Sequence, residues 1–320
     1  MTGHHGLWEH AEFTTPRFNH GYCTDDNARA LIVVGRVEEP SSDLIALGET
    51  YLAFLQHAEL PTGGFVNRRN PDGTWSAGVG SDDSQGRAIW ALGTIGGHAP
   101  TAGMQDMALS IFDRCRGFRS TSPRANAFAI LGAGEVLLSH PDHPAASELL
   151  DRCVSHLHIN DDASWPWQEH RLAYDNARIP EALLLAGTVL GNDGLIDAGI
   201  DLLAWLAAIE TSDRHFSFTP TGGWTLGEPR PAFDQQPVEA AAMADACSRA
   251  LSITGNPRWK DGVSMAARWF LGDNDAGLPL YDPVTGGCAD GLGRDFTNLN
   301  QGAESTLAAL SVLQQAQNVL

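Results

Sequence analysis

The stretch TDDNARALIVVGRV at residues 24–37 begins with a polar cluster and continues as an apolar run with helical spacing. Five later stretches share this order, and they begin near Ser81, Ser122, Tyr174, Asp234 and Asn300. The tetrapeptide Asp-Asn-Ala-Arg occurs at 26–29 and again at 175–178. Because self-similarity along a chain is typical of repeat architectures, we interpret the six stretches as one repeated helical unit.

A second set of helical stretches alternates with the first, and its members are more amphipathic. They are expected near residues 42–57, 102–116, 144–158, 194–210 and 257–271. Helices that are apolar all round are buried, whereas amphipathic helices keep one face in water. The sequence therefore predicts six inner and five to six outer helices, which form an all-α (α/α)6 toroid. We expect a single catalytic domain over residues 1–320.

The predicted connections between helices differ in length. Those from an inner to an outer helix are short, as at 37–42. Those from an outer to an inner helix are long and lie at about 59–82, 159–174, 211–234 and 272–300. Since each long connection leads into an inner helix, we expect these loops to gather at one mouth of the toroid. A Pro-Thr-Gly-Gly-aromatic sequence at 61–65 and at 220–224 predicts short β-hairpins there.

Composition narrows the range of partners. The chain carries 39 acidic and 20 basic residues, a formal net charge of −19, which repels nucleic acids and anionic membranes. No basic, apolar leader precedes Trp8, and no apolar run is long enough to cross a membrane. The five cysteines are odd in number and scattered, as in a reduced compartment. We therefore expect a cytoplasmic protein with a neutral oligosaccharide substrate and neither a nucleic-acid nor a membrane partner.

Carboxylates concentrate where the inner helices begin. They are Asp25, Asp26, Asp82, Asp83, Asp175, Glu239 and Glu304. Helix capping, with Thr24 and Ser81 as expected N-caps, explains one acid per helix but not two adjacent ones. Glycoside hydrolysis needs one protonated and one ionised carboxyl group, and crowding in a partly dry site separates their pKa values. We assign Glu239 as the general acid and Asp25 or Asp26 as the general base.

Other side chains near these acids suit the binding of a sugar. Three arginines follow the acids by about one helical turn and can neutralise or orient them: Arg29, Arg87 and Arg178. Polar groups suited to sugar hydroxyls are His20, Tyr22, Tyr174, Gln235 and Gln236. Aromatic rings that could stack on a sugar face are Trp75, Trp167 and Trp224. For any single ring, packing onto the core is the simpler interpretation.

The run His20-Gly21-Tyr22-Cys23-Thr24-Asp25-Asp26-Asn27-Ala28-Arg29, with Tyr174-Asp175-Asn176-Ala177-Arg178 later, resembles a group of bacterial proteins often found beside glycosyltransferases. The architecture is similar to the (α/α)6 glycoside hydrolases, many of which invert configuration. The mycobacterial endomannosidases that trim methylmannose polysaccharides are a closer resemblance. They imply hydrolysis of an α-1,4-linked mannoside inside the cell. The resemblance covers most of the chain but identifies no catalytic pair.

Several alternatives remain open. A sugar 2-epimerase shares this toroid and would use histidines facing each other, for which His20, His170 and His215 lie in suitable loops. A zinc-dependent toroid would need a ligand set, yet Cys23 and Cys288 lack paired spacing, so we expect no metal and no cofactor. A non-catalytic carbohydrate-binding toroid would keep these acids for structural reasons alone. A polysaccharide lyase would favour a basic cleft instead. The sequence does not predict an oligomeric state.

Overall fold

The computed structural model describes residues 1–61 and 63–319. Over these residues the chain forms eleven α-helices, whereas its strands are only two residues long. The chain divides into two compact units. The first unit holds Met1–His10 and Thr15–Leu157, and the second holds Ala11–Thr14 and the chain from His158 onward. The prediction of one domain over residues 1–320 stays a prediction.

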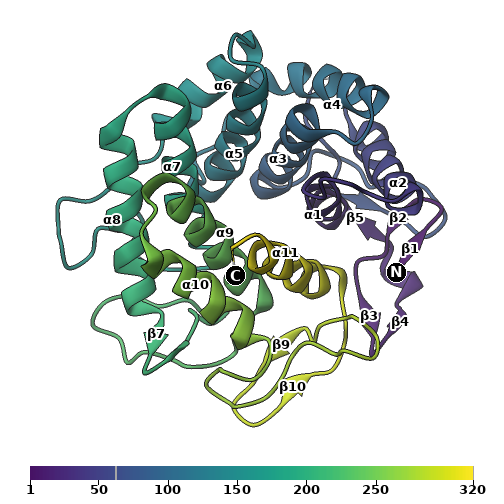
Figure 1. Ribbon diagram of the computed structural model, residues 1–320. Helices are drawn as coiled ribbons and strands as arrows, with labels where there is room; N and C mark the ends of the chain where they lie inside the picture. The colour runs from purple at the N-terminus through teal and green to yellow at the C-terminus, as the bar shows by residue number, and fades with distance from the viewer. Residues whose placement is uncertain (62, 320) are drawn as a thin grey trace. The chain divides into compact units, whose positions relative to one another are not determined.

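Three buried helices alternate with three amphipathic ones in the first unit, whose helices run from purple to teal in Figure 1. The helices are α1 (Thr24–Gly35), α2 (Ser42–Ala58), α3 (Asp82–His98), α4 (Ala102–Arg114), α5 (Pro123–Ser139) and α6 (Pro144–Val154). Helix α3 packs against α1 and α5, and each of these three packs against the helix that follows it. The predicted alternation of inner and outer helices is thus confirmed within this unit.

Two glycines allow α3 and α5 to approach each other closely. A Cβ atom added at Gly93 would lie 2.1 Å from the carbonyl oxygen of Gly132. A Cβ atom at Gly132 would lie 2.4 Å from the carbonyl oxygen of Ile89. Because only glycine leaves room for backbone at this distance, these positions set the spacing between the two helices.

The second unit repeats the arrangement with five helices. They are α7 (Arg178–Leu190), α8 (Asp193–Ile209), α9 (Pro237–Thr254), α10 (Pro257–Trp269) and α11 (Ala303–Val319). Helix α9 packs against α7, α10 and α11, and α7 packs against α8. Helix α7 begins at Arg178 rather than near Tyr174 as predicted. The physical reason is that Asp175 has a φ of 52°, which a right-handed helix cannot include.

Short antiparallel pairs accompany the helices. In the first unit β1 (Thr2–Gly3) pairs with β2 (Gly6–Leu7), and β5 (Tyr22–Cys23) pairs with β6 (Arg68–Arg69). In the second unit β7 (Thr211–Ser212) pairs with β8 (His215–Phe216), and β9 (Gly291–Leu292) pairs with β10 (Thr297–Asn298). The remaining short elements are β3 (Ala11–Glu12), β4 (Thr15–Pro16) and the 3₁₀ helices η1 (Phe18–His20) and η2 (Cys115–Gly117).

The two predicted hairpin turns have different outcomes. Around residues 61–65, Phe65 forms an antiparallel bridge with Glu59, so the chain does turn back there, although Thr62 lies outside the described residues. Around residues 220–224, Trp224 bridges to Leu172 instead of to its own loop. The second turn therefore joins two long connections to each other.

The long connections meet the amino ends of the inner helices within each unit. In the first, β5 directly precedes α1 and pairs with β6 of the connection that leads to α3. In the second, Gln235 just before α9 exchanges two backbone hydrogen bonds, of 3.0 and 2.9 Å, with Leu292 in the connection that leads to α11. Each unit thus presents its loops and the amino ends of its inner helices together.

The thiols of this chain lie in buried surroundings. All five cysteines are buried and none forms a disulfide. Burial raises the pKa of Cys115, Cys153 and Cys247 to about 12, because a thiolate loses its hydration there. None of the described helices combines the length and the apolar character that a membrane crossing requires.

Candidate active site

The first turn of α1 carries two carboxylates in different surroundings. Asp26 is 3% exposed, whereas the Asp25 side chain is 20% exposed. The helix is capped by Cys23, whose sulfur accepts a hydrogen bond from the Asp26 N–H at 3.4 Å. The expected cap, Thr24, instead donates its hydroxyl to the carbonyl of Val66 at 2.7 Å, so the capping prediction is wrong at this helix. Ser81 is confirmed as the N-cap of α3.

Arginines pair with both carboxylates of α1. Arg29 Nη1 lies 2.8 Å from Asp26 Oδ1, and Arg87 Nε lies 3.3 Å from Asp25 Oδ1. The Arg87 guanidinium is itself buried and lies 4.2 Å from the centre of the Phe128 ring. The expected pairing of an acid with an arginine one turn away is therefore found for Asp26 and Arg29, whereas Arg87 of α3 pairs with an acid of another helix, α1. Asp25 is the more accessible acid of the two.

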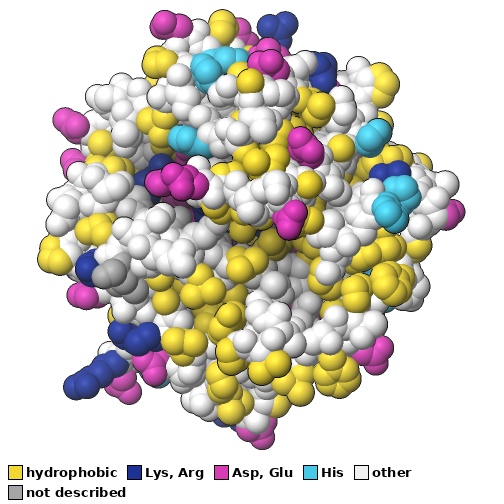
Figure 2. All heavy atoms as spheres, turned by 45° about the vertical axis from the view of Figure 1, so that its right-hand side comes forward, with side chains coloured by type: hydrophobic (Ala, Val, Ile, Leu, Met, Phe, Trp, Pro, Cys, Tyr) yellow, Lys and Arg dark blue, Asp and Glu magenta, His cyan; other side chains and the backbone are white. Residues whose placement is uncertain are grey.

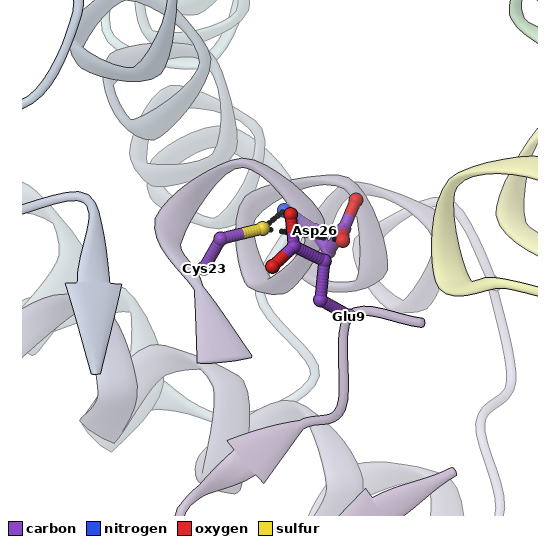
Figure 3. A group of neighbouring side chains, drawn as sticks. All are labelled: Glu9, Cys23 and Asp26. Atoms are coloured by element: carbon purple, nitrogen blue, oxygen red, sulfur yellow. Dashed lines mark hydrogen bonds between the residues drawn. The ribbon is translucent and has the colours of Figure 1, made fainter. Parts of the chain in front are cut away.

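Figure 3 shows Glu9, Cys23 and Asp26 turned toward one another at the start of α1. One ligand-type atom from each lies within 4.8 Å of the others. However, burial and the nearby charges of Asp26 and Glu9 raise the pKa of the Cys23 thiol, which donates to Asp26 Oδ2 at 3.2 Å. A metal would need the thiolate, and Arg29 and Arg68 already neutralise the two carboxylates. The cluster fits a hydrogen-bonded helix cap better than a metal site.

Aromatic side chains and histidines lie in the segment before α1 and in the connection that leads to α3. Tyr22 is buried and stacks on Trp8 with ring centres 3.9 Å apart, and burial raises the pKa of its phenol. His20 is exposed, and its Nδ1 lies 3.0 Å from Nδ1 of His10. Trp75 is half-buried with Arg69 5.2 Å from its ring centre. His20 and Trp75 therefore have exposed surface, whereas Tyr22 does not.

The acidic doublet of α3 ties two inner helices together. Asp82 accepts a hydrogen bond from the Ser120 hydroxyl at 2.6 Å, and Asp83 accepts one from Ser122 at 3.2 Å. Ser122 is the N-cap of α5, so the doublet holds the starts of α3 and α5 in register. This placement gives Asp82 and Asp83 a structural task that capping alone did not predict.

Sequence reasoning missed Gln85, which lies one turn into α3. Its Oε1 accepts from the Phe65 N–H at 2.6 Å, and its Nε2 donates to the Phe65 carbonyl at 2.9 Å. The buried amide therefore anchors the long connection to the inner helix. A polar residue on the otherwise apolar face of α3 was the available signal.

Glu239 lies in the first turn of α9 and is 3% exposed. Its two oxygens accept from the backbone N–H groups of Asp175 at 2.5 Å and Asn176 at 3.3 Å. Burial raises the pKa of Glu239 well above its ordinary value, the charges of Glu210 and Asp175 raise it further, and the two N–H groups partly oppose them. The carboxyl group therefore holds its proton more tightly than an exposed glutamate.

Arg178 lies at the centre of a buried charged cluster next to this contact. Its Nε lies 3.2 Å from Asp175, and its Nη1 lies 2.8 Å from Glu181 and 2.5 Å from Asp245. Arg249 lies 3.6 Å from Glu181. Three carboxylates thus share two guanidinium groups, and the attraction of these carboxylates raises the pKa of Arg178 against the effect of burial.

Glu181 and Asp245 were not among the predicted site residues. Glu181 follows Arg178 by three residues, so helical spacing could have indicated it. Asp245 stands alone in the Ala-rich run of α9, where an isolated acid in a buried helix was the available signal. Ser311 and Gln315 of α11 donate to Asp245 at 3.3 and 2.8 Å, which connects a third inner helix to the cluster.

The other predicted residues of the second unit differ in exposure. Gln235 is buried, and its Oε1 accepts from Trp269 Nε1 at 3.1 Å. Trp167 is 0% exposed with its ring centre 6.2 Å from that of Trp205, and Trp224 is 9% exposed. These placements favour packing for the two tryptophans. Four predicted residues keep partly or fully exposed surface: Tyr174, Gln236, Glu304 and His170.

Charge is distributed rather than concentrated. Figure 2 shows acidic side chains scattered singly among hydrophobic and uncharged groups over the face in view. The net charge of −19 therefore does not form one acidic patch on this face. In contrast, four acids at the inner-helix starts have arginines or backbone N–H groups as partners: Asp25, Asp26, Asp175 and Glu239.

No family model and no curated protein matches this chain. Solved structures do match over almost its whole length. A cellobiose 2-epimerase from Spirochaeta thermophila has a TM-score of 0.70 at 14% identity, over 98% of this chain and 90% of that one. A sugar epimerase from a ruminal bacterium has a TM-score of 0.73 at 11% identity, over 97% and 92%.

An α-mannanase of glycoside hydrolase family 76 from Bacteroides thetaiotaomicron also matches. Its TM-score is 0.64 at 11% identity, over 93% of this chain and 86% of that one. At such low identity the similarity establishes the fold alone. The prediction of an all-α protein of the (α/α)6 toroid class is thereby confirmed.

Proposed function

We propose that this protein is a carbohydrate-processing enzyme, specifically a glycoside hydrolase that cleaves a neutral α-mannoside. Two kinds of observation support the proposal. The fold is shared with an α-mannanase and with sugar epimerases. The inner helices carry carboxyl groups in contrasting surroundings, with Asp25 partly exposed beside a guanidinium and Glu239 buried with a raised pKa. The contrast between these two carboxyl groups carries the proposal, because hydrolysis needs one of each kind.

In the proposed reaction Glu239 is the general acid. Its proton goes to the glycosidic oxygen as the bond from that oxygen to the anomeric carbon breaks. Asp25, which lies beside Arg87, takes a proton from the attacking water, whose oxygen bonds to the anomeric carbon. Asp26 positions this turn through Arg29 and Cys23. The methylmannose polysaccharide-type substrate and the inverting outcome rest on the resemblance of the motif at residues 20–29.

The test is turnover of α-linked manno-oligosaccharides, methylated and unmethylated, followed by mass spectrometry, with NMR for the anomer released. We expect Asp25→Asn and Glu239→Gln each to lower kcat by about 10²–10⁴-fold. The matched control is Asp193→Asn, an exposed first-turn acid of outer helix α8, which should keep wild-type turnover. Wild-type rates in either site variant would contradict the assignment of that residue.

A sugar 2-epimerase is the second candidate, supported by the two epimerase structures and by the His10–His20 contact. In that case the same panel would remain uncut, whereas a reducing sugar would change its configuration at C2. Substitution of His20→Asn should then abolish the change. Cleavage of a glycosidic bond without any C2 exchange would eliminate this candidate.

A further inference from the structure

Phe13 has an unusual backbone and an exposed ring. It lies between β3 and β4 with a φ of 52°, a region that bulky side chains avoid because Cβ crowds the carbonyl oxygen. Its side chain is nevertheless 58% exposed, so burial of the ring does not offset this strain. Packing of the ring therefore does not explain why an aromatic residue occupies this strained position.

The turn at Phe13 is held on both sides by the segment that leads into α11. The Phe13 N–H donates to Asn300 Oδ1 at 3.0 Å, and its carbonyl accepts from the Gln301 N–H at 2.8 Å. Gln301 is fixed in turn by donating to Asp282 at 3.1 Å. These bonds hold the strained backbone that carries the ring just ahead of α11, at the loop end of the second unit.

Further exposed apolar side chains belong to the same segment. Phe296 in the turn of the β9–β10 hairpin is 56% exposed, and Leu299 after β10 is 61% exposed. Asn298 between them is also exposed and offers a polar amide.

We propose that Phe13 is a stacking platform for one pyranose ring of an oligosaccharide. The ring would bind away from the bond that is cut, with Leu299, which directly precedes Asn300, extending the apolar surface. The proposal rests on the proposed function and adds a distal binding position to it. Sugars present C–H groups on one face and hydroxyls at the rim, which suits an apolar ring with amides nearby.

The size of the patch favours a sugar over a protein partner. A stable protein interface covers about 800 Å² on each side and about 20–30 residues. Three exposed apolar side chains provide only part of such an area. A pyranose ring, in contrast, is about as large as one aromatic ring.

The experiment compares binding of α-linked mannotetraose and of mannose, by titration calorimetry, to wild type and Phe13→Gly. Glycine accepts the positive φ, so the melting temperature should stay equal or rise while the ring is removed. We expect the Kd for mannotetraose to rise about tenfold, which corresponds to about 1.4 kcal/mol, and the Kd for mannose to rise less. Phe13→Trp should restore the affinity. Val284→Ala, which truncates a 91% exposed apolar side chain elsewhere in this unit, should bind as wild type.

The outcomes separate the platform from the proposed function. Unchanged mannotetraose affinity in Phe13→Gly would overturn the platform and leave the proposed function standing. A wild type that binds and cleaves no sugar would overturn both. A concentration-dependent dimer that Phe13→Gly abolishes in sedimentation would replace the sugar with a second copy of this chain.

Discussion

The two copies of Asp-Asn-Ala-Arg, one in each unit, have different backbone conformations. Asp26 lies within the first turn of α1, whereas Asp175 has a positive φ and precedes α7. Both copies nevertheless keep the pair between the acid and the arginine three residues later, at 2.8 Å and 3.2 Å. The comparison indicates that the motif conserves a charge contact rather than a backbone shape.

The surroundings of the two copies explain the difference. In the first, a thiol caps the Asp26 N–H. In the second, the carboxyl group of Glu239 on α9 accepts from two consecutive backbone N–H groups, and Arg178 faces two additional carboxylates. The second copy is therefore tied to distant parts of the chain, and we expect it to tolerate substitution less well than the first.

The largest expected difference is between the losses of stability when the arginine of each copy, Arg29 or Arg178, is replaced by alanine. Arg178→Ala removes the guanidinium that pairs with three buried carboxylates, and we expect it to lower the free energy of unfolding by about 3–5 kcal/mol. Arg29→Ala, at a position 14% exposed, should cost about 1–2 kcal/mol. Urea unfolding of both variants measures the effects, with Arg178→Lys as a control that keeps the charge. Equal losses at the two positions would contradict the expectation that the second copy tolerates substitution less well.

A smaller effect is the difference in stability between an alanine and a glycine substitution of the motif aspartate, which should have opposite signs at Asp26 and Asp175. Replacing each aspartate by either alanine or glycine removes the carboxylate in both cases, so the difference reports the backbone alone. At Asp26 alanine should be more stable by about 0.5–1 kcal/mol, because glycine weakens a helix. At Asp175 glycine should be more stable by about 1 kcal/mol, because alanine resists the positive φ. Thermal unfolding of the four variants tests this, and the same order at both positions would refute it.

The smallest expected effect is in the pH dependence of stability. The pKa of Glu239 is raised in the folded protein, so above its ordinary value of 4.5 the folded state binds more protons than the unfolded state. The contribution of this group is complete below pH 4.5 and is lost as pH rises through the folded pKa. Glu239→Gln should therefore flatten the fall in unfolding free energy as pH rises above 4.5. An unchanged slope would show that Glu239 is ionised when folded.

Periodicity predicted the eleven helices because burial on one face or all round is encoded locally. It also predicted that acids and arginines one turn apart would pair, as Asp26 and Arg29 do. The loss of Thr24 as a cap could not be predicted, because its hydroxyl bonds to Val66 in a distant loop. The isolated Asp245 was visible in the sequence, but its pairing with Arg178 was not, because that contact arises only from the packing of α9 on α7.

The site was less predictable than the fold for a related reason. Burial of Trp167 and Gln235 depends on contacts with Trp205 and Trp269, which come from other helices. A loop aromatic that packs inward and one that faces solvent look alike in sequence. Phe13 was missed because its conformation comes from Asn300 and Gln301, at the far end of the chain.

The five buried cysteines can serve as labelling sites that report partial unfolding. Cys23, Cys115 and Cys153 belong to the first unit, and Cys247 and Cys288 belong to the second. Alkylating agents modify a thiolate, so each thiol becomes reactive only when its surroundings open. Peptide mapping after brief alkylation in mild denaturant would therefore record, thiol by thiol, whether the two units open in one cooperative step or in sequence.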